Sequence, residues 1–278
     1  MYANRNFDPL VAFPLFGGLG LILVFFAFGF LQAFGGVGNH SLYVDENRSL
    51  WAMGDNDNGQ LGDGSLTDRN QPYKISTGGG ILDFAHGMGH TLYIQDDGSL
   101  WATGDNAYGQ LGVGDLIDRN ESVKIVDANV TAVAAGMQHS VFLKRDGSLW
   151  TMGRNDYGQL GNGNGSQQNN PTKVVVAGVV SIAAGSHHTC FVKLDGSLWT
   201  VGLNTNGQLG NGFTNNLIAP GPIEFSGVSV VAAGERHSLY LKSDGSLWGM
   251  GYNANGQLGD SDTADRSTRF KVVDSNVT

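Results

Sequence analysis

The sequence predicts an all-β protein, a β-propeller of five repeats of about 49 residues, each a four-stranded sheet. Two observations carry this prediction. Tryptophan recurs at a nearly constant interval, as Trp51, Trp101, Trp150, Trp199 and Trp248. A histidine followed by serine or threonine keeps the same interval, at His40, His90, His139, His188 and His237. A fixed period of about 20–50 residues is typical of stacked repeat folds, propellers among them.

Each repeat contains the pattern of four short strands. In the third repeat we expect strands over residues 133–136, 139–144, 148–152 and 173–176. Asp146-Gly147 separates the second strand from the third and favours a two-residue type I′ hairpin, because glycine adopts positive φ without strain. The first repeat has Asn47-Arg48 instead, and arginine at positive φ costs about 1 kcal/mol, so that turn is expected to differ.

Both faces of the predicted sheets are apolar. Val141 and Leu143 point to one face of their strand and Phe142 to the other, because successive side chains alternate. A sheet that is apolar on both faces must be covered on both, and stacking similar sheets around an axis achieves this. We expect each tryptophan to bury about 150–250 Å² between neighbouring sheets.

The chain length leaves two arrangements open. Residues 33–278 span five periods, and the C-terminal residues 273–278 match residues 126–131, which precede the third inner strand. One arrangement is a closed five-bladed ring, in which the strand Ala33–Val37 completes the last blade. The other is an incomplete seven-bladed arc. Unpaired edges promote aggregation, and this favours closure.

The N-terminal segment, residues 1–32, is set apart from the repeat domain, residues 33–278. No charge occurs from Leu10 to Val37, and about 20 apolar residues suffice to cross a bilayer. Arg5 precedes this stretch and acidic residues dominate the region after it, so the positive-inside rule favours repeats on the non-cytoplasmic side. We expect residues 10–32 to place the chain in a membrane during export. A cleaved signal, an artefactual start and buried core are the alternatives.

Composition excludes several classes of site and partner. The net charge is −9 and no Lys/Arg cluster occurs, whereas a duplex-binding protein needs a basic face, so we expect no nucleic-acid partner. Cys190 is the single cysteine, which excludes an intrachain disulfide and a zinc site of the Cys-pair type. No cofactor is indicated.

Candidate catalytic and metal-binding groups have simpler explanations. The repeated histidine and hydroxyl resemble a hydrolytic dyad, but adjacent side chains on a strand diverge. We expect them to satisfy backbone groups within the sheet. Residues 55–59 echo the start of a calcium loop, yet Leu66 stands where its glutamate would be, and a turn held by side-chain caps accounts for them better. His187-His188 lacks a third ligand. We therefore expect no catalytic residue and no metal site.

The variable loops after each Gly-Gln-Leu-Gly hold the candidate partner-binding residues. Three of these loops contain an Asp-Arg pair: Asp68 and Arg69, Asp118 and Arg119, Asp265 and Arg266. Loops at equivalent positions of a propeller lie on one face, so the pairs would form a charged rim for a partner. Alternatively, each is a local surface ion pair, which contributes little.

The repeated motif resembles that of the regulator of chromosome condensation family. The matching residues are His-Ser/Thr, then Asp-Gly-Ser-Leu-Trp, then Gly-x-Asn-x-x-Gly-Gln-Leu-Gly, over about residues 33–278. The resemblance implies a propeller, usually of seven blades. The family's founding members exchange guanine nucleotide on a small nuclear GTPase and bind chromatin, and many others are general interaction modules. The exchange wedge and the basic tail of those members have no counterpart here, so neither function is carried over.

These observations predict a non-enzymatic interaction scaffold, membrane-tethered or exported, that binds another protein or a surface polymer. One alternative is a guanine-nucleotide exchange factor for a small GTPase, which would have to be cytosolic. The other is a propeller lyase or hydrolase, which needs a non-repeated polar cluster at the axis. The sequence contains no clear sign of such a cluster.

Overall fold

The structure is a computed structural model that describes residues 38–75 and 79–277, all within one unit, Leu31–Thr278. The described residues form nineteen strands and no helix. Accordingly, this part of the chain has no helix that is long and apolar enough to cross a membrane. The predicted membrane segment, residues 10–32, lies outside the described residues.

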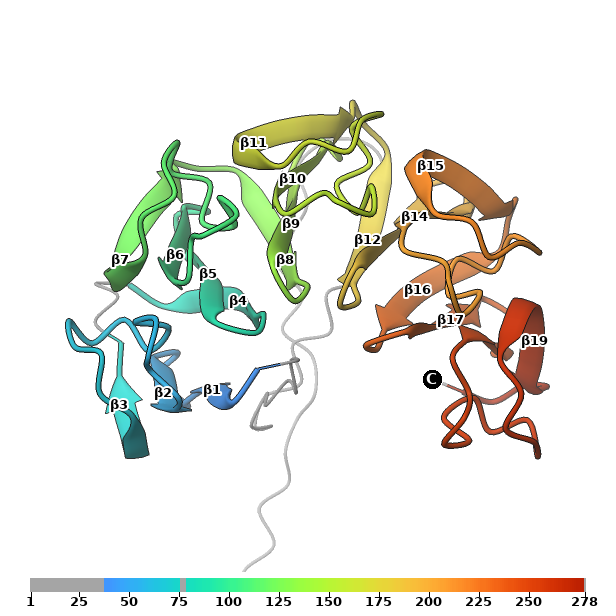
Figure 1. The fold of residues 1–278 in the computed structure, drawn as a ribbon, viewed down its shortest axis with the longest axis horizontal. Coiled ribbons are helices and arrows are strands. Elements are labelled where there is room, and N and C mark those ends of the chain that lie inside the picture. The colour runs from blue at the N-terminus through green and yellow to red at the C-terminus, as the bar shows by residue number, and fades with distance from the viewer. Residues whose placement is uncertain (1–37, 76–78, 278) are drawn as a thin grey trace, which may run out of the picture. The chain divides into compact units, whose positions relative to one another are not determined.

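Five antiparallel sheets follow one another along the chain (Figure 1). The first has three strands: β1 (His40–Val44), β2 (Leu50–Gly54) and β3 (Arg69–Lys74). The second has β4 (Ile81–His86), β5 (His90–Gln95), β6 (Leu100–Gly104) and β7 (Arg119–Val126). The third has β8 (Val130–Ala135), β9 (His139–Lys144), β10 (Leu149–Gly153) and β11 (Gln168–Val175). The fourth has β12 (Val179–Ala184), β13 (His188–Lys193), β14 (Leu198–Gly202) and β15 (Leu217–Glu224). The fifth has β16 (Val228–Ala233), β17 (His237–Lys242), β18 (Leu247–Gly251) and β19 (Arg266–Val273).

The hairpin between the second and third strands of a sheet is not the predicted two-residue turn. In the third sheet the Gly147 amide donates to the Lys144 carbonyl at 2.8 Å, and the Lys144 amide donates to the Ser148 carbonyl at 3.0 Å. Gly147 has a φ of 75° while Asp146 is not at positive φ. This is the three-residue loop in which a type I turn ends in a left-handed glycine. The first sheet has the same turn, with Arg48 in the left-handed conformation at a φ of 60°, so the expectation that this turn would differ was wrong.

The five sheets form an open arc rather than a closed ring. The inner strands β4, β8, β12 and β16 contact one another in that order, and Figure 1 shows an opening between the first sheet and the fifth. The fifth sheet already has four strands of its own, so the prediction that residues 33–37 complete it was wrong. The first sheet is the one with three strands, and residues 33–37 lie outside the described residues.

The hydrophobic core lies between neighbouring sheets, as the two-sided apolar pattern predicted. Val141 and Phe142, on opposite faces of β9, are both fully buried. The tryptophans are half-buried, and Trp101, Trp150 and Trp199 each pack against a hydrophobic cluster shared by two neighbouring sheets. The Trp150 ring stacks on Phe142 of the neighbouring strand at 6.0 Å, and its Nε1 donates to Ser148 Oγ at 2.9 Å. The tryptophans therefore lie at the junctions between sheets, as predicted, and they also stack on an aromatic ring of their own sheet.

A histidine–hydroxyl hydrogen bond joins each sheet to the next. The four bonds run from His40 to Thr91, His90 to Ser140, His139 to Thr189 and His188 to Ser238, at 2.9–3.1 Å. Each hydroxyl donates its one proton to a glutamine carbonyl of the preceding sheet, as Thr189 does to Gln159 at 2.8 Å. The histidine Nε2 must then be the donor to the hydroxyl oxygen. The histidine and hydroxyl diverge as predicted, but they join neighbouring sheets rather than satisfying one sheet.

We expect His139→Ala to lower the free energy of unfolding by about 1–3 kcal/mol, because it leaves Thr189 without its buried donor. His237→Ala is the matched control, since His237 is only half-buried and has no such hydroxyl partner among the described residues. Denaturant unfolding of both variants measures the difference. Equal losses for the two substitutions would contradict the role assigned to the junction bond.

Candidate interaction face

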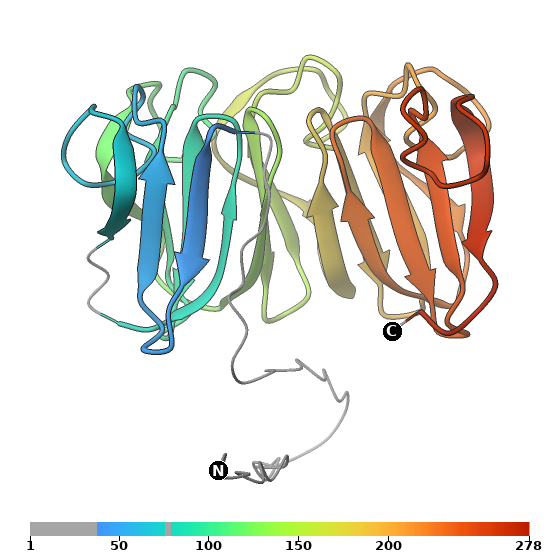
Figure 2. The same ribbon diagram turned by 90° about the horizontal axis from the view of Figure 1, so that it is seen from below.

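Two loops of every sheet meet at one edge of the arc, which we call the loop face. One loop precedes the histidine strand and the other follows the tryptophan strand, and a backbone hydrogen bond joins them in each sheet. In the third sheet the Arg154 amide donates to the Gln138 carbonyl at 2.8 Å, and in the fourth the Leu203 amide donates to the His187 carbonyl at 2.8 Å. The loop face is the upper edge in Figure 2 and faces the viewer in Figure 1.

A repeated polar frame holds the longer of these loops. In the second sheet, Asn106 is fully buried. Its Oδ1 accepts the Leu111 amide at 3.0 Å, and its Nδ2 donates to the Asp115 carbonyl at 3.0 Å. Gln110 Oε1 accepts the Tyr108 amide at 2.9 Å. The equivalent asparagine and glutamine make the corresponding bonds to the two amides in the other four sheets. These are the side-chain caps that the sequence predicted, and they fix the backbone on which other side chains are presented.

Two positions on this frame differ from sheet to sheet. The residue after the strand-ending glycine is Asp55, Asp105, Arg154, Leu203 or Tyr252. The residue before the repeated histidine is Asn39, Gly89, Gln138, His187 or Arg236. Because the surrounding frame repeats, these positions can change without altering the fold. Sequence reasoning concentrated on the later loop segments and missed them, although aligning the five copies reveals the variation.

The most elaborate group on the loop face surrounds Arg154. Its guanidinium carbon lies 4.9 Å from the ring centre of Tyr108, in the second sheet, and 5.8 Å from that of Tyr157. Its Nε donates to Asp156 at 2.6 Å and its Nη1 to Gln138 Oε1 at 2.7 Å. Only 23% of its side chain is exposed. The guanidinium is therefore held in one orientation between two aromatic rings.

His187 of the fourth sheet extends this group. Its ring centre lies 5.1 Å from that of Tyr157. Partial burial, then the positive charges of Arg154 and Arg236, lower the pKa of His187 below its usual value, so the ring is neutral at pH 7. Arginine and tyrosine are the residue types that most often dominate binding energy in protein interfaces. We call Tyr108, Arg154, Tyr157 and His187 the Arg154 cluster.

Comparison with known proteins places this architecture in a family. The model of the RCC1-like domain matches residues 26–277. The chain belongs to the RCC1-like domain family. No curated protein sequence matches it significantly.

Solved structures with RCC1-like propellers resemble the described arc. Human WBSCR16 is 25% identical with a TM-score of 0.76, over 85% of this chain and 65% of that one. Yeast RCC1 (Prp20), solved bound to Kap60, is 21% identical with a TM-score of 0.73, over 85% of this chain and 59% of that one. Prp20p from Saccharomyces cerevisiae, described with its binding to Gsp1p and histones, is 21% identical with a TM-score of 0.73, over 85% of this chain and 61% of that one. The chain thus spans about three fifths of the length of these structures.

The Asp-Arg pairs of the RCC1-like repeats do not pair internally. Each aspartate accepts the amide of the buried asparagine that starts its loop, at 2.7–2.9 Å: Asp68 from Asn56, Asp118 from Asn106 and Asp265 from Asn253. Each arginine instead pairs with an earlier acid of the same loop: Arg69 with Asp63, Arg119 with Asp115, and Arg266 with Asp260 and Asp262. All six residues brace their own loops on the loop face. Their contact with a partner stays a prediction.

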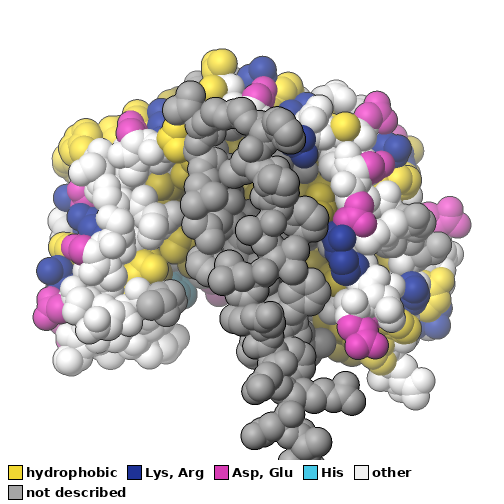
Figure 3. All heavy atoms as spheres, turned by 180° about the vertical axis from the view of Figure 1, so that it is seen from behind, with side chains coloured by type: hydrophobic (Ala, Val, Ile, Leu, Met, Phe, Trp, Pro, Cys, Tyr) yellow, Lys and Arg dark blue, Asp and Glu magenta, His cyan; other side chains and the backbone are white. Residues whose placement is uncertain are grey.

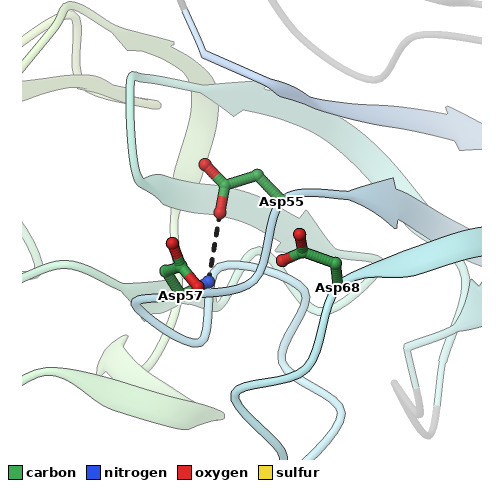
Figure 4. Close-up of side chains that lie close together, drawn as sticks. All are labelled: Asp55, Asp57 and Asp68. Atoms are coloured by element: carbon green, nitrogen blue, oxygen red, sulfur yellow. Dashed lines mark hydrogen bonds between the residues drawn. The ribbon is translucent and has the colours of Figure 1, made fainter.

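Three carboxylates of the first RCC1-like repeat approach one another, Asp55, Asp57 and Asp68 (Figure 4). Within the described residues they are the group whose spacing fits a cation, with ligand oxygens within 4.8 Å of one another. Calcium takes six to eight oxygen ligands in proteins. Asp55 already accepts the Asp57 amide at 3.1 Å, and Asp68 accepts the Asn56 amide at 2.9 Å. These bonds agree with the predicted capping role of the turn.

The face opposite the loop face carries the hairpin turns. On its visible part, lysine and arginine side chains alternate with acidic ones rather than forming a field of one sign (Figure 3). Lysines of these strands lie over the tryptophan rings, as Lys193 does over Trp199 at 3.9 Å and Lys144 over Trp150 at 4.6 Å. The basic residues near the turns are thus partly engaged in cation–π contacts within the sheet.

Proposed function

We propose that this chain is a non-enzymatic scaffold that binds a protein partner through the Arg154 cluster on the loop face. One observation carries the proposal. Four of the five repeated histidines and their hydroxyl partners are occupied in sheet junctions, whereas the Arg154 cluster is not repeated, is partly exposed and is held in place by the repeated frame. A fixed arginine between aromatic rings suits a binding surface, because little side-chain entropy is lost when a partner docks.

The comparisons support a protein as the partner. Prp20p, whose propeller resembles the described arc, is described with binding to Gsp1p and to histones, and it was solved in a complex with Kap60. Those partners belong to that protein. For this chain the support is that a protein containing a similar propeller binds other proteins.

The proposal includes a location outside the cytoplasm, with the repeats held at a membrane or exported. Its basis is the uncharged stretch at residues 10–32 and the charges that flank it. Fusing residues 1–45 to a topology reporter tests it. We expect the reporter to be membrane-associated and active only outside the cytoplasm, and a soluble cytosolic reporter would reject this part.

The binding site is tested with two double variants. Arg154→Ala with Tyr157→Ala removes the centre of the cluster, and Arg145→Ala with Leu194→Ala changes exposed residues of the opposite hairpin face. The test compares the proteins that full-length wild type and each variant retain from the extracellular and membrane fractions of the source cells. We expect the first variant to lose at least one partner by tenfold or more while keeping its melting temperature, and the second to keep it. Equal recovery by both variants would reject the cluster as the site.

Guanine-nucleotide exchange is the second candidate, favoured by the likeness to Prp20p, which is described with Gsp1p. Release of a fluorescent GDP analogue from small GTPases of the source organism measures it. Acceleration by wild type that is lost in the Arg154→Ala, Tyr157→Ala variant would replace the scaffold proposal with exchange. A cytosolic result in the topology assay would point the same way.

A further inference from the structure

Three apolar side chains project from the hairpin face at the third and fourth sheets. Val176 follows β11, Leu194 follows β13 and Phe225 follows β15. Each is 76% exposed, more than any other large hydrophobic residue that the structure describes. A single exposed apolar side chain is ordinary, whereas a group of them marks a surface for a partner or a membrane. We call these three residues the apolar tip.

The residues of the apolar tip lie on adjoining turns. The Leu194 amide donates to the Gly178 carbonyl at 2.7 Å, so the hairpin turn of the fourth sheet lies beside the connection that begins with Val176. The Gly196 carbonyl of the same turn accepts the first amide of β16 at 3.0 Å, directly after the connection that begins with Phe225. Leu194 therefore lies on a turn between the other two, and the three side chains belong to one region of the surface.

The repeat itself does not require apolar residues at these positions. Where the structure describes them, the equivalent residues of the other sheets are charged or polar: Asp127 and Asp274 in place of Val176 and Phe225, and Glu46, Asp96, Arg145 and Ser243 in place of Leu194. The sheets form with either kind of residue at these exposed positions. The fold therefore does not explain the apolar tip.

Basic side chains accompany the apolar tip. Four of them lie at the hairpin end of the third and fourth sheets: Lys144, Arg145, Lys173 and Lys193. Two acids at this end, Asp146 and Asp195, cap their own turns. A third acid, Glu224, pairs with Lys242 of the fifth sheet at 3.0 Å. With that pair balanced, basic groups outnumber acidic ones around the tip, in a chain whose net charge is −9.

We propose that this part of the hairpin face docks on a membrane surface that contains anionic lipids. The apolar tip inserts at the boundary between headgroups and acyl chains, and the basic side chains lie near the lipid phosphates. Apolar side chains flanked by basic ones are the combination that binds this interface. The hollow beside Leu194 is shallow and wide open, so it does not enclose a side chain of a folded protein partner.

This orientation directs the loop face away from the membrane. The Arg154 cluster lies on that opposite face (Figure 2), so it stays accessible to a protein partner while the hairpin face contacts lipid. The inference shares with the proposed function only its location at a membrane. It assigns a separate surface and a different class of ligand.

The test places an environment-sensitive fluorophore on each face of the full-length protein. Cys190 is the single cysteine and is buried, so an introduced, exposed cysteine is labelled selectively. Ser226→Cys places the label beside Phe225 and leaves the apolar tip intact, and Thr205→Cys places it on the loop face as the matched control. We expect the emission at position 226 to shift to the blue with vesicles that contain phosphatidylglycerol, and much less with vesicles of phosphatidylcholine alone. The emission at position 205 should not change.

Replacing the apolar tip by serine separates docking from any membrane insertion by residues 10–32. With Val176→Ser, Leu194→Ser and Phe225→Ser, we expect an unchanged melting temperature and loss of the shift at position 226, even if the chain stays on the vesicles. A shift that persists in this triple variant, equal shifts at both labelled positions, or no shift with the tip intact would overturn the proposal. So would a shift produced by proteins of the source membrane but not by lipid vesicles, because the occupant would then be a protein. The variant that removes the Arg154 cluster should shift as the wild type does, so this inference and the proposed function fail separately.

Discussion

Gly207→Ala is expected to destabilise the protein by about 3–5 kcal/mol, whereas Gly256→Ala costs only about 1–2 kcal/mol. Both glycines begin a Gly-Gln-Leu-Gly segment, and both have positive φ, 81° and 74° respectively. Alanine at either position therefore bears the same conformational strain. Only at Gly207 would the new Cβ also lie 2.8 Å from the Arg266 carbonyl oxygen and overlap the backbone of Ser267 in the next sheet.

The difference between these two variants isolates the contribution of close sheet packing. Backbone atoms cannot move aside as a flexible side chain does, so the fourth and fifth sheets must separate slightly to admit the methyl group. Denaturant unfolding at constant pH measures both losses. A loss for Gly207→Ala no larger than that for Gly256→Ala would mean that the junction between the last two sheets is looser than the structure has it.

The repeat period by itself predicts most of the fold. Histidine and tryptophan recur because each occupies one position of a repeated sheet, and the pattern of the third repeat predicts the strand β9 with its observed bounds, His139–Lys144. The hydrogen-bond partner of the histidine was not predictable. Strand alternation shows that His139 and Ser140 diverge, but it does not say that one side chain contacts the following sheet and the other the preceding one. That information depends on how sheets stack, which a single repeat does not encode.

The candidate site was harder to predict for a different reason. The Asp-Arg pairs attracted attention because opposite charges adjoin in sequence, yet adjacent residues often point apart, and each side chain here binds an earlier part of its own loop. The Arg154 cluster joins Tyr108 of one sheet, Arg154 of the next and His187 of a third. These residues lie far apart in the chain, so only the curvature of the arc brings them together.

Acidification is expected to unfold the protein well above the pH at which most carboxylates titrate. The junction histidines are His40, His90, His139 and His188. Burial first, and then the charge of neighbouring histidines, lowers the pKa of each from 6.5 to about 3. The unfolded chain therefore binds about four more protons than the folded one between pH 6.5 and 3. The stability from these groups is complete above pH 6.5 and is lost as the pH falls.

One buried acid opposes this trend without reversing it. Asp83 accepts the Val133 amide across a junction at 3.0 Å, and burial raises its pKa to about 6. Its folded form holds a proton that the unfolded form releases, so between pH 6 and 4 this group favours the folded state as the pH falls. The proton that Asp83 releases on unfolding offsets one of the four that the histidines take up, which leaves about three. The free energy of unfolding should therefore drop by about 4 kcal/mol per pH unit near pH 5.

Denaturant unfolding between pH 7.5 and 4.5 measures this slope, which counts the protons taken up on unfolding. His139→Gln provides the matched variant. Its amide can still donate to Thr189, but it does not titrate, so the slope should fall by about one proton, roughly 1.4 kcal/mol per pH unit. An unfolding free energy that stays flat from pH 7.5 to 5 would show that the junction histidines are already charged in the folded protein, or reach solvent there. That result would leave the assignment of Nε2 as the donor unchanged, but it would contradict a junction without water. A buried imidazolium needs an acceptor at Nδ1, and the four junction histidines have none among the described residues.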